Sequence, residues 1–427
     1  MPAFLPSTPA ALDAATWGIA GLATAGVIAR PFRWPEAVWA VTGAALLVLL
    51  GLLTPDAALV GIARGTDVYL FLIGMMVLAE LARQEGLFDW LAALATRAAA
   101  GSANRLFLLV YAVGTLVTVF LSNDATAVVL TPAVYAACRA ARVRDPLPYL
   151  FVCAFIANAA SFVLPISNPA NLVVFGPQLP PLGAWLARFA LPSALAILAT
   201  YLGLRLVFRR ELAAETVAAA VERPRLSVGG RLAGLGIAVA AVILAGASAL
   251  GHDLGLPTLA AGLGTAALIL LATRKGPGDL VRHVSWSVLP LVAGLFVLVE
   301  ALERTGLIRL LAGTLRDAAS GHATATAWGA GLVTALACNL LNNLPAGLIA
   351  GSTVQAAGVP DAVTGAVLIG VDLGPNLSIT GSLATILWLT ALRREGAEVG
   401  AWRFLKVGLV VTPPALVLAI GALVAFG

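Results

Sequence analysis

Charge is scarce in this sequence. Only 11% of its 427 residues are charged, 60% are hydrophobic, and the mean hydropathy is +0.97. Soluble domains carry about 25% charged residues, so this composition excludes a soluble globular domain. Many apolar runs reach the roughly 20 residues that cross a bilayer. The sequence predicts a polytopic membrane protein, and its net charge of +5 is no indication of nucleic-acid binding.

Cysteine and histidine are also rare, with three of each. Cys138, Cys153 and Cys338 form no CxxC pair, and the histidines lie scattered at segment ends, so neither a disulfide framework nor a metal site is predicted. HExxH, P-loop and GxGxxG motifs are absent. We therefore expect no enzyme and no cofactor. Residues 1–13 have no basic region, so no cleavable signal peptide is expected.

Two halves of the chain repeat each other. Residues 68–123 recur at 288–343, an offset of 220, and each copy ends in polar residues within an apolar run. The matched positions are Gly74 and Gly294, Glu80 and Glu300, Gly86 and Gly306, Leu87 and Leu307, Leu91 and Leu311, Ala92 and Ala312, Gly101 and Gly321, and Leu121-Ser122-Asn123 and Leu341-Asn342-Asn343. In membrane proteins this pattern is typical of transporters whose site lies between the repeats.

Apolar runs and breaks follow the same order in both halves. The first repeat, 1–208, is predicted to contain spans near 14–30, 35–53 and 67–84, an interfacial helix at 87–99, two short arms at 106–140, a broken helix at 149–177 and a span at 182–208. A charged linker covers 209–231. The second repeat, 232–427, is predicted to contain spans near 232–250, 256–273 and 286–303, an interfacial helix at 306–318, two arms at 323–357, a broken helix at 361–392 and a span at 404–426.

The two-armed segments have two interpretations. Each is either a span plus a loop, or a re-entrant hairpin with its tip at mid-depth. If both are hairpins, each half has five spans, and the second half is inverted because five is odd. The predicted cytoplasmic side then holds every Lys and Arg except Arg64, Arg188, Arg304, Arg309 and Arg316. The positive-inside rule favours this scheme, which places both termini outside the cytoplasm.

Polar residues interrupt the apolar runs at four symmetric places. These are Ser122-Asn123-Asp124, Ser167-Asn168-Pro169-Ala170-Asn171, Asn342-Asn343, and Asn376 with Ser378, Thr380 and Ser382. Irregular backbone at membrane depth must line a cavity or pack within protein. Helix halves that end there direct free N–H or C=O groups at a common point. One break alone would indicate helix capping, whereas four matched breaks predict a substrate site.

Asp124 is the charged residue most costly to place in a membrane, at roughly 2.5–3.5 kcal/mol. Its matched position holds Leu344, so no structural duty is shared by the two halves. It either caps the second hairpin arm or exchanges a proton or cation, and we favour exchange. Asp372 lies nearer a helix end, and the same two roles stay open for it.

The remaining candidates favour structural roles. Glu80 and Glu300 are matched, and each has an arginine at i+3 or i+4, Arg83 and Arg304, as an expected partner. Cys338 lies four residues before Asn342. Small apolar packing is favoured there over a thiol ligand for a soft substrate.

Three blocks carry a family resemblance. They are Phe120-Leu-Ser-Asn-Asp124 with Val129-Leu-Thr-Pro132, Asn342-Asn343-Leu344-Pro345, and Asp372-Leu-Gly-Pro-Asn-Leu377 with Thr380-Gly-Ser-Leu-Ala-Thr-Ile-Leu387. They resemble the arsenite and antimonite efflux permease family of the ion transporter superfamily, from about residue 35 to the C-terminus. The chain departs from the family at Asn158, where members often carry an acid.

The resemblance implies inverted repeats with hairpins and broken helices, and export of As(OH)₃ or Sb(OH)₃ across a bacterial or archaeal inner membrane in exchange for protons. The implied substrate-binding residues are Asn123, Ser167, Asn168, Asn171, Asn342, Asn343, Asn376 and Thr380, and the proton-coupling residues are Asp124 and Asp372. Two protein partners stay open, a second copy of the chain and a separate ATPase subunit.

The chemistry of the polar residues fits a neutral or cationic substrate better than a dianion, because Asp124 stands there without a central Lys or Arg. Amides and hydroxyls match the hydroxyl groups of a trihydroxide. The alternatives are a sodium/proton antiporter or sodium-coupled anion transporter of the same superfamily, and, from another class, a membrane enzyme or scaffold. Sodium dependence of transport would distinguish the sodium-coupled transporters from the arsenite exporter. Absence of any solute flux would favour the membrane enzyme or scaffold.

Overall fold

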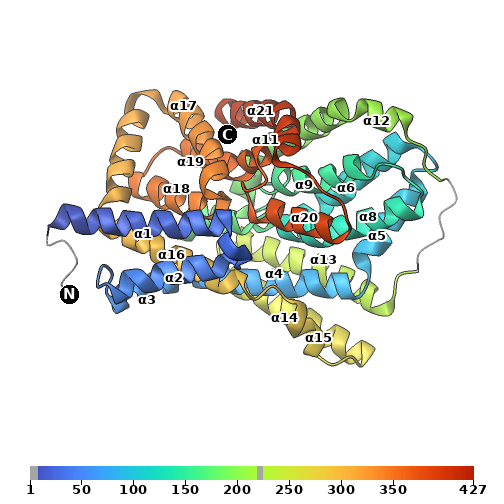
Figure 1. Cartoon of the computed structure of the whole chain (residues 1–427), viewed down its shortest axis with the longest axis horizontal. Coiled ribbons are helices and arrows are strands. Elements are labelled where there is room, and N and C mark those ends of the chain that lie inside the picture. The colour runs from blue at the N-terminus through green and yellow to red at the C-terminus, as the bar shows by residue number, and fades with distance from the viewer. Residues whose placement is uncertain (1–7, 219–224) are drawn as a thin grey trace.

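The computed structural model describes residues 8–218 and 225–427 (Figure 1). Every regular element within these two ranges is a helix, which confirms the predicted all-α class. Of the predicted linker 209–231, residues 219–224 lie outside the described ranges. The described part of the linker begins with α12 (Arg209–Ala214).

The first half runs from α1 to α11. Its helices are α1 (Pro9–Ala29), η1 (Pro31–Arg33), α2 (Glu36–Leu49), α3 (Pro55–Arg64), α4 (Thr66–Gln84), α5 (Leu87–Ala98), α6 (Ala103–Phe120), α7 (Asn123–Ala125), η2 (Thr126–Leu130), α8 (Thr131–Ala140), α9 (Leu147–Ala159), η3 (Pro165–Ser167), α10 (Pro169–Phe175), η4 (Gly176–Gln178) and α11 (Leu182–Val207).

The second half follows the same order. Its helices are α13 (Val228–Ala249), α14 (Gly255–Thr273), α15 (Gly278–His283), α16 (Val288–Arg304), α17 (Leu307–Leu341), α18 (Asn343–Ala357), α19 (Asp361–Leu373), η5 (Gly374–Leu377), α20 (Leu383–Arg394) and α21 (Ala401–Phe426).

Seven helices in the described ranges are long and apolar enough to cross a bilayer, and α3 with α4, bent by 50°, would make an eighth. The chain is therefore a multi-pass membrane protein. This count differs from the predicted five spans per half partly because α2 and α9 have only 14 and 13 residues. At 1.5 Å per residue they cover about two thirds of a ~30 Å hydrocarbon core. The five-plus-five scheme stays a prediction.

One element was not expected. Residues 55–64, to which the sequence analysis assigns no element, form α3; Thr54 begins it, since its Oγ1 accepts a hydrogen bond from the Ala57 amide at 3.3 Å. The predicted division between the interfacial helix 306–318 and the arm beginning at 323 is confirmed: α17 consists of two helical parts that meet at a kink at His322, where a φ of −141° and a ψ of 49° interrupt the helical backbone.

Matched helices pack against partners from the opposite half. A Cβ atom on Gly74 of α4 would lie 2.5 Å from the Thr258 carbonyl carbon of α14, and one on Gly294 of α16 would lie 2.8 Å from the Ala40 carbonyl carbon of α2. Only glycine allows helix backbones to approach so closely. The repeated glycines therefore hold α4 on α14 and α16 on α2 in the same way.

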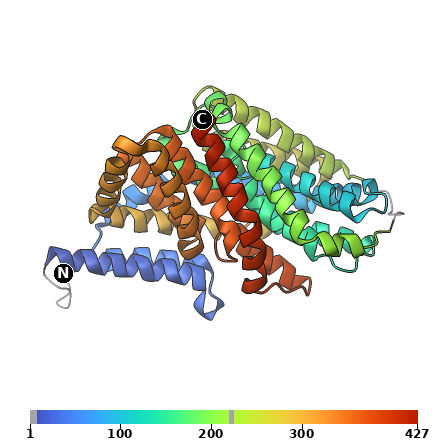
Figure 2. The ribbon, with the colours of Figure 1, turned by 90° about the horizontal axis from the view of Figure 1, so that it is seen from above.

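The mates α4 and α16 run antiparallel. Arg64, just before α4, forms an ion pair with Glu300 near the end of α16, with Nη1 and Oε2 2.9 Å apart. Arg83, near the end of α4, lines the same cavity as Val288 at the start of α16. This course supports the predicted inversion of the second half. The mates α11 and α21 also lie side by side (Figure 2).

The helices form two bodies. We call α1–α4 and α13–α16 the frame, and we call the hairpins and broken helices with α11 and α21 (103–218 and 323–427) the hairpin unit. Within the described ranges, hydrogen bonds and ion pairs tie the frame to itself and the hairpin unit to itself, and none joins the two. The two bodies are joined by α5 and by the first part of α17, and elsewhere they meet without a hydrogen bond or ion pair among the described residues.

Candidate functional site

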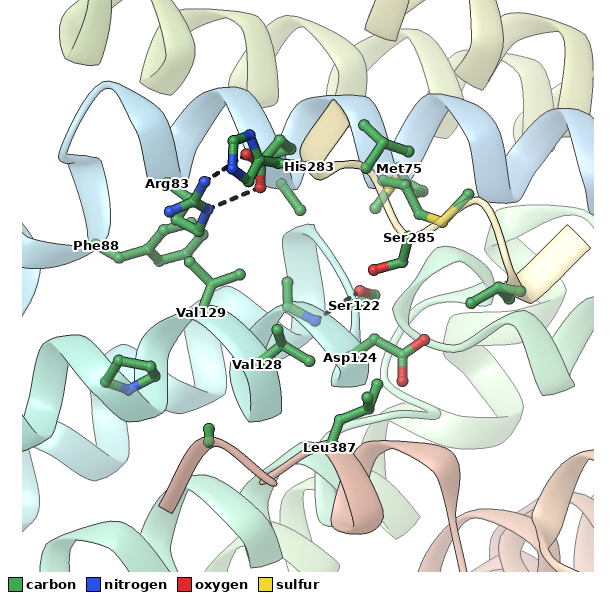
Figure 3. Close-up of a pocket in the computed structure, with 18 of the residues that line it drawn as sticks. Met75, Arg83, Phe88, Ser122, Asp124, Val128, Val129, His283, Ser285 and Leu387 are labelled. Carbon is green, nitrogen blue, oxygen red and sulfur yellow. Dashed lines mark hydrogen bonds and ion pairs between the residues drawn. The ribbon is translucent and has the colours of Figure 1, made fainter. Parts of the chain in front are cut away.

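The first hairpin tip borders a large cavity. It has a volume of about 690 Å³ and lies between α4 of the frame and the hairpin α6–α8 and α20 of the hairpin unit (Figure 3). The exposed side chains that line it are Arg83, Asp89, Arg282, His283, Ser285, Arg394 and Glu395. The buried end is lined by Leu72, Ser122 and Ala125. The cavity thus leads from the surface to the tip.

Asp124 faces this cavity from α7. In Figure 3 its carboxylate and the Ser285 hydroxyl lie on opposite sides of the same space. The carboxylate does not cap the helix, because Ser122 does: its Oγ accepts from the Ala125 amide at 3.1 Å. The capping explanation is therefore wrong. No side-chain partner for Asp124 occurs among residues 8–218 and 225–427, which leaves its carboxylate free to bind a solute or a proton.

The local backbone explains how the hairpin presents Asp124. Ser122 is extended, at φ −173° and ψ 165°, and the helix resumes directly after it. Residues 126–130 then form a π-helical turn, with the Thr131 hydroxyl bonded to the Thr126 carbonyl at 3.3 Å. Such turns are frequent at functional sites. Asn123 itself is buried, and its Oδ1 accepts from the Asp124 amide at 2.9 Å.

The matched glutamates have the expected partners. Glu80 accepts hydrogen bonds from Arg83 at 2.8 and 2.6 Å and from Gln84 at 2.6 Å. Glu300 accepts from Arg304 at 2.8 Å. The predicted i+3 and i+4 ion pairs are confirmed, and they satisfy two otherwise buried carboxylates.

Asp372 does not reach the cavity. It is fully buried, and its Oδ1 accepts a hydrogen bond from Asn168 Nδ2 at 2.6 Å. Asn168 also caps α10, because its Oδ1 accepts from the Ala170 amide at 3.0 Å. Asp372 and Asn168 therefore link the broken helix of one half to that of the other.

The remaining first-half candidates hold the break in the broken helix. The Asn171 amide nitrogen donates to the carbonyls of Ser161, Leu164 and Pro165 at 2.8, 3.1 and 3.3 Å. The Ser167 hydroxyl donates to the Val119 carbonyl at 3.0 Å. This second bond fixes the break against the end of α6, beside the hairpin tip.

The second-half candidates form the matching junction. The backbone of Asn342 has a φ of 69°, and its side-chain Nδ2 donates to the Thr380 carbonyl at 3.1 Å. The backbone N–H of Asn343 donates to the Gly381 carbonyl at 2.8 Å. The Thr380 hydroxyl lies 3.4 Å from that of Ser378. Both hairpin tips are thus bonded to the broken helix of their own half.

A second, nearly closed void marks the matched position in the other half. Phe71, Met75, Ser122 and Asp124 line the large cavity, and their mates at offset 220 line a void of about 10 Å³. Those mates are Leu291, Leu295, Asn342 and Leu344. A volume of this size holds at most about one water molecule. Matched positions therefore line a large cavity in the first half and a very small one in the second.

Several cavity residues were missed by the sequence analysis. Arg282 lies on α15, Ser285 on the α15–α16 connection, Thr390 on α20, and Met75 on α4. Only Met75 could have been singled out from the sequence, because Met75 and Met76 are two of just three methionines in the chain. Among the described residues no cluster of three or more His, Cys, Asp or Glu could hold a metal ion.

Comparisons with known proteins place the chain in a family. The citrate transporter family model matches residues 25–370. The arsenical pump membrane protein of Yersinia enterocolitica is 31% identical over 365 residues, which are 82% of this chain and 84% of that protein. The arsenical pump membrane protein of Escherichia coli strain K12 is 29% identical over 402 residues, covering 90% and 92%.

A solved structure shares the fold. The YdaH transporter of Alcanivorax borkumensis, whose crystal structure is described as having an unusual topology, superposes with a TM-score of 0.59 at 19% identity over 86% of both chains. The chain belongs to the arsenite and antimonite efflux permease family, within the group that the citrate transporter model describes, and is a membrane transporter.

Proposed function

We propose that this transporter exports As(OH)₃ and Sb(OH)₃ from the cytoplasm in exchange for protons. The observation that carries the proposal is Asp124, a carboxylate without a side-chain partner among the described residues, at the inner end of a cavity of about 690 Å³. The names of the similar proteins from Yersinia enterocolitica and Escherichia coli support an arsenical substrate.

The charges at the cavity mouth support an orientation in the membrane. Arg83, Arg282 and Arg394 lie there, on the side that the positive-inside rule assigns to the cytoplasm. In Figure 1, α5, α8 and α12 lie at one end of the long axis, and α17 and α18 lie at the other. The proposal places the first group at the cytoplasmic face of an inner membrane, with both termini on the opposite side.

The substrate chemistry suits a single carboxylate. As(OH)₃ is neutral near pH 7 and offers three hydroxyl donors, and an ionised carboxylate accepts such bonds. A proton on Asp124 removes its charge and turns one acceptor oxygen into a donor, which weakens the bonds that the substrate hydroxyls donate, so substrate and proton compete for one group. In the proposal Asp124 meets the substrate, and the buried Asn123 supports it from behind, since its Oδ1 accepts from the Asp124 backbone N–H. Ser167, Asn168, Asn171, Asn342, Asn343, Asn376 and Thr380 shape the site, and Asp372 stays a second proton carrier.

Movement of the hairpin unit would convert the open side into the closed one. Its boundary with the frame lacks hydrogen bonds in the described ranges, so sliding along it breaks none. Matched residues line the large cavity and the void of about 10 Å³. A shift that exchanges the two would close access from the cytoplasm and open it to the other side.

A sodium-coupled anion transporter is the second candidate, because the matching family model is described as a citrate transporter. The charge distribution disfavours it. The arginines lie at the exposed end of the cavity, while the carboxylate of Asp124 lies farther in, where it would repel a carboxylate substrate. A homodimer and a separate ATPase subunit stay predictions; the proposal needs neither.

The test is uptake of arsenite into everted membrane vesicles under an imposed proton gradient, with sodium varied. We expect uptake that depends on the gradient, ignores sodium and is absent from vesicles without the protein. Citrate uptake that requires sodium would favour the second candidate. The Asp124→Asn variant serves as the inactive control, provided that it is inserted at the wild-type level.

A further inference from the structure

The first segments of the two broken helices, α9 and α19, end in polar residues at equivalent positions. α9 and α19 each have 13 residues after a proline at the N-cap, and the second-last residue is Asn158 in α9 and Asp372 in α19. Both side chains are at most 1% exposed. Neither lines the large cavity, so neither can meet a solute there in this conformation.

Asn158 reaches the break in the other half. Its Nδ2 donates to Asn376 Oδ1 at 2.8 Å and to Thr385 Oγ1 at 3.4 Å. Asn376 returns a bond from its own Nδ2 to the Phe155 carbonyl of α9 at 3.1 Å. One bond therefore joins the two side-chain amides, a second ties Asn376 to the backbone of α9, and Asn376 uses both of its polar atoms inside the protein.

Asp372 makes the matching contact in the opposite direction. It belongs to the second half, and it accepts a bond from Asn168 at the break of the first half, at 2.6 Å. Trp388 adds a third link, from its Nε1 to the Leu150 carbonyl at 2.9 Å. Each broken helix is thus held at its break by the other one.

We propose that these reciprocal contacts form one joint between the broken helices, and that Asn158 is a positioning residue for transport. The joint keeps the two breaks, and the hairpin tips bonded to them, in a fixed arrangement while the hairpin unit moves against the frame. Without Asn158 the breaks in the two broken helices could shift independently of each other. The hairpin unit would then move without keeping the residues of the substrate site together. The transport part of this inference rests on the proposed function, whereas the joint itself does not.

The joint is tested first without any substrate. Thermal unfolding in detergent is measured for Asn158→Leu, Asn376→Leu and the double variant. We expect the double variant to lose clearly less thermal stability than the sum of the two single losses, because each single change already breaks the bond between Asn158 and Asn376. Losses that add fully would overturn the joint. Thr353→Val is the matched control: it removes a buried hydroxyl that bonds only within its own helix, to the Ile349 carbonyl at 2.7 Å.

The other side of the joint allows a second comparison. Asp372→Asn keeps an oxygen that can accept from Asn168, whereas Asp372→Leu does not. We expect only the leucine variant to reproduce the loss of thermal stability caused by Asn158→Leu. Equal losses from both Asp372 variants would show that the charge, and not the contact with Asn168, holds this side.

The positioning role is then tested in vesicles. Asn158→Leu should lower the maximum arsenite uptake rate per inserted molecule by about fivefold or more, the equivalent of one lost hydrogen bond, and leave KM close to wild type. A purely structural role would reduce the inserted amount without changing the rate per molecule, and that result would overturn the positioning role. If wild-type vesicles take up no arsenite, the proposed function fails, while the unfolding data still decide whether the joint exists.

Discussion

At the scale of single residues, Asp124 decides the chemistry. Asp124→Asn keeps the size of the side chain and removes its ability to ionise. We expect it to abolish proton-coupled arsenite uptake in everted vesicles while the protein stays folded and inserted. Because the carboxylate has no side-chain partner in the described ranges, little thermal stability should be lost. Uptake at the wild-type rate with an unchanged pH dependence would contradict the proton-carrier role.

The cysteines provide a second residue-scale prediction. Cys138, Cys153 and Cys338 are each at most 1% exposed, and none lines either cavity. Replacing all three with alanine should leave substantial arsenite export, at a stability cost of the order of 1 kcal/mol per small cavity. Vesicle uptake by the cysteine-free protein measures this. Loss of transport from Cys338→Ala alone, at normal insertion, would indicate a thiol ligand instead of hydrogen-bonding groups.

Sequence reasoning could find Asp124 but not the roles of the asparagines. Asp124 stands out because a lone acid in an apolar run is costly wherever it points. Asn376 and Asn171 stand out equally, yet their amides are bonded inside the protein. The partners of Asn376 lie 218 and 221 residues away, in α9. Local sequence contains no information on contacts of that separation, so it could not show which amides are occupied.

At the scale of elements, apolar runs located most helices and missed α3. This helix has only 10 residues, about half the length of a span, so no separate apolar run marks it. The predicted boundary between the interfacial helix and the hairpin arm is confirmed, because the backbone leaves the helical region at His322, between residues 318 and 323.

The linker is anchored at one element boundary by Glu215. Its carboxylate accepts hydrogen bonds from the Arg144 and Asp145 amides, both at 3.1 Å, in the α8–α9 connection. Burial raises the pKa of Glu215, but these backbone N–H groups outweigh it and hold the pKa below its usual range. The lowered pKa means that the anchor is present above the unfolded-state value and is lost as pH falls through the folded-state value.

Glu215→Gln should therefore loosen this connection at neutral pH, since the neutral amide offers one acceptor oxygen in place of two. Hydrogen exchange followed by mass spectrometry should show faster exchange in peptides covering 141–150 and little change in those covering α11. Unchanged protection of the Arg144 and Asp145 amides would show that the linker is held by other contacts, such as the Ala218 amide to the Ala141 carbonyl at 2.9 Å.

At the scale of the whole molecule, the inverted repeat predicts a topology. Reporter fusions in the linker 209–231 should be active only on the cytoplasmic side, and a fusion after Gly427 only on the periplasmic side. The physical reason is the distribution of Lys and Arg, which the positive-inside rule converts into an orientation. A reporter that is active on the cytoplasmic side at Gly427 would contradict the five-plus-five scheme.

The paired cavities give a direct test of the transport cycle. Met75 and Leu295 are matched positions, but Met75 lines the cavity of about 690 Å³ and Leu295 the void of about 10 Å³. In the cysteine-free protein, Met75→Cys should react with a membrane-impermeant maleimide applied from the cytoplasmic side, and Leu295→Cys should react from neither side at rest. Arsenite supplied on the cytoplasmic side should then make Leu295→Cys reactive from the opposite side. The movement that closes the cavity at Met75 is expected to open the void at Leu295. Equal labelling of both positions from one side, before and after substrate, would mean that the frame and the hairpin unit do not exchange the two cavities.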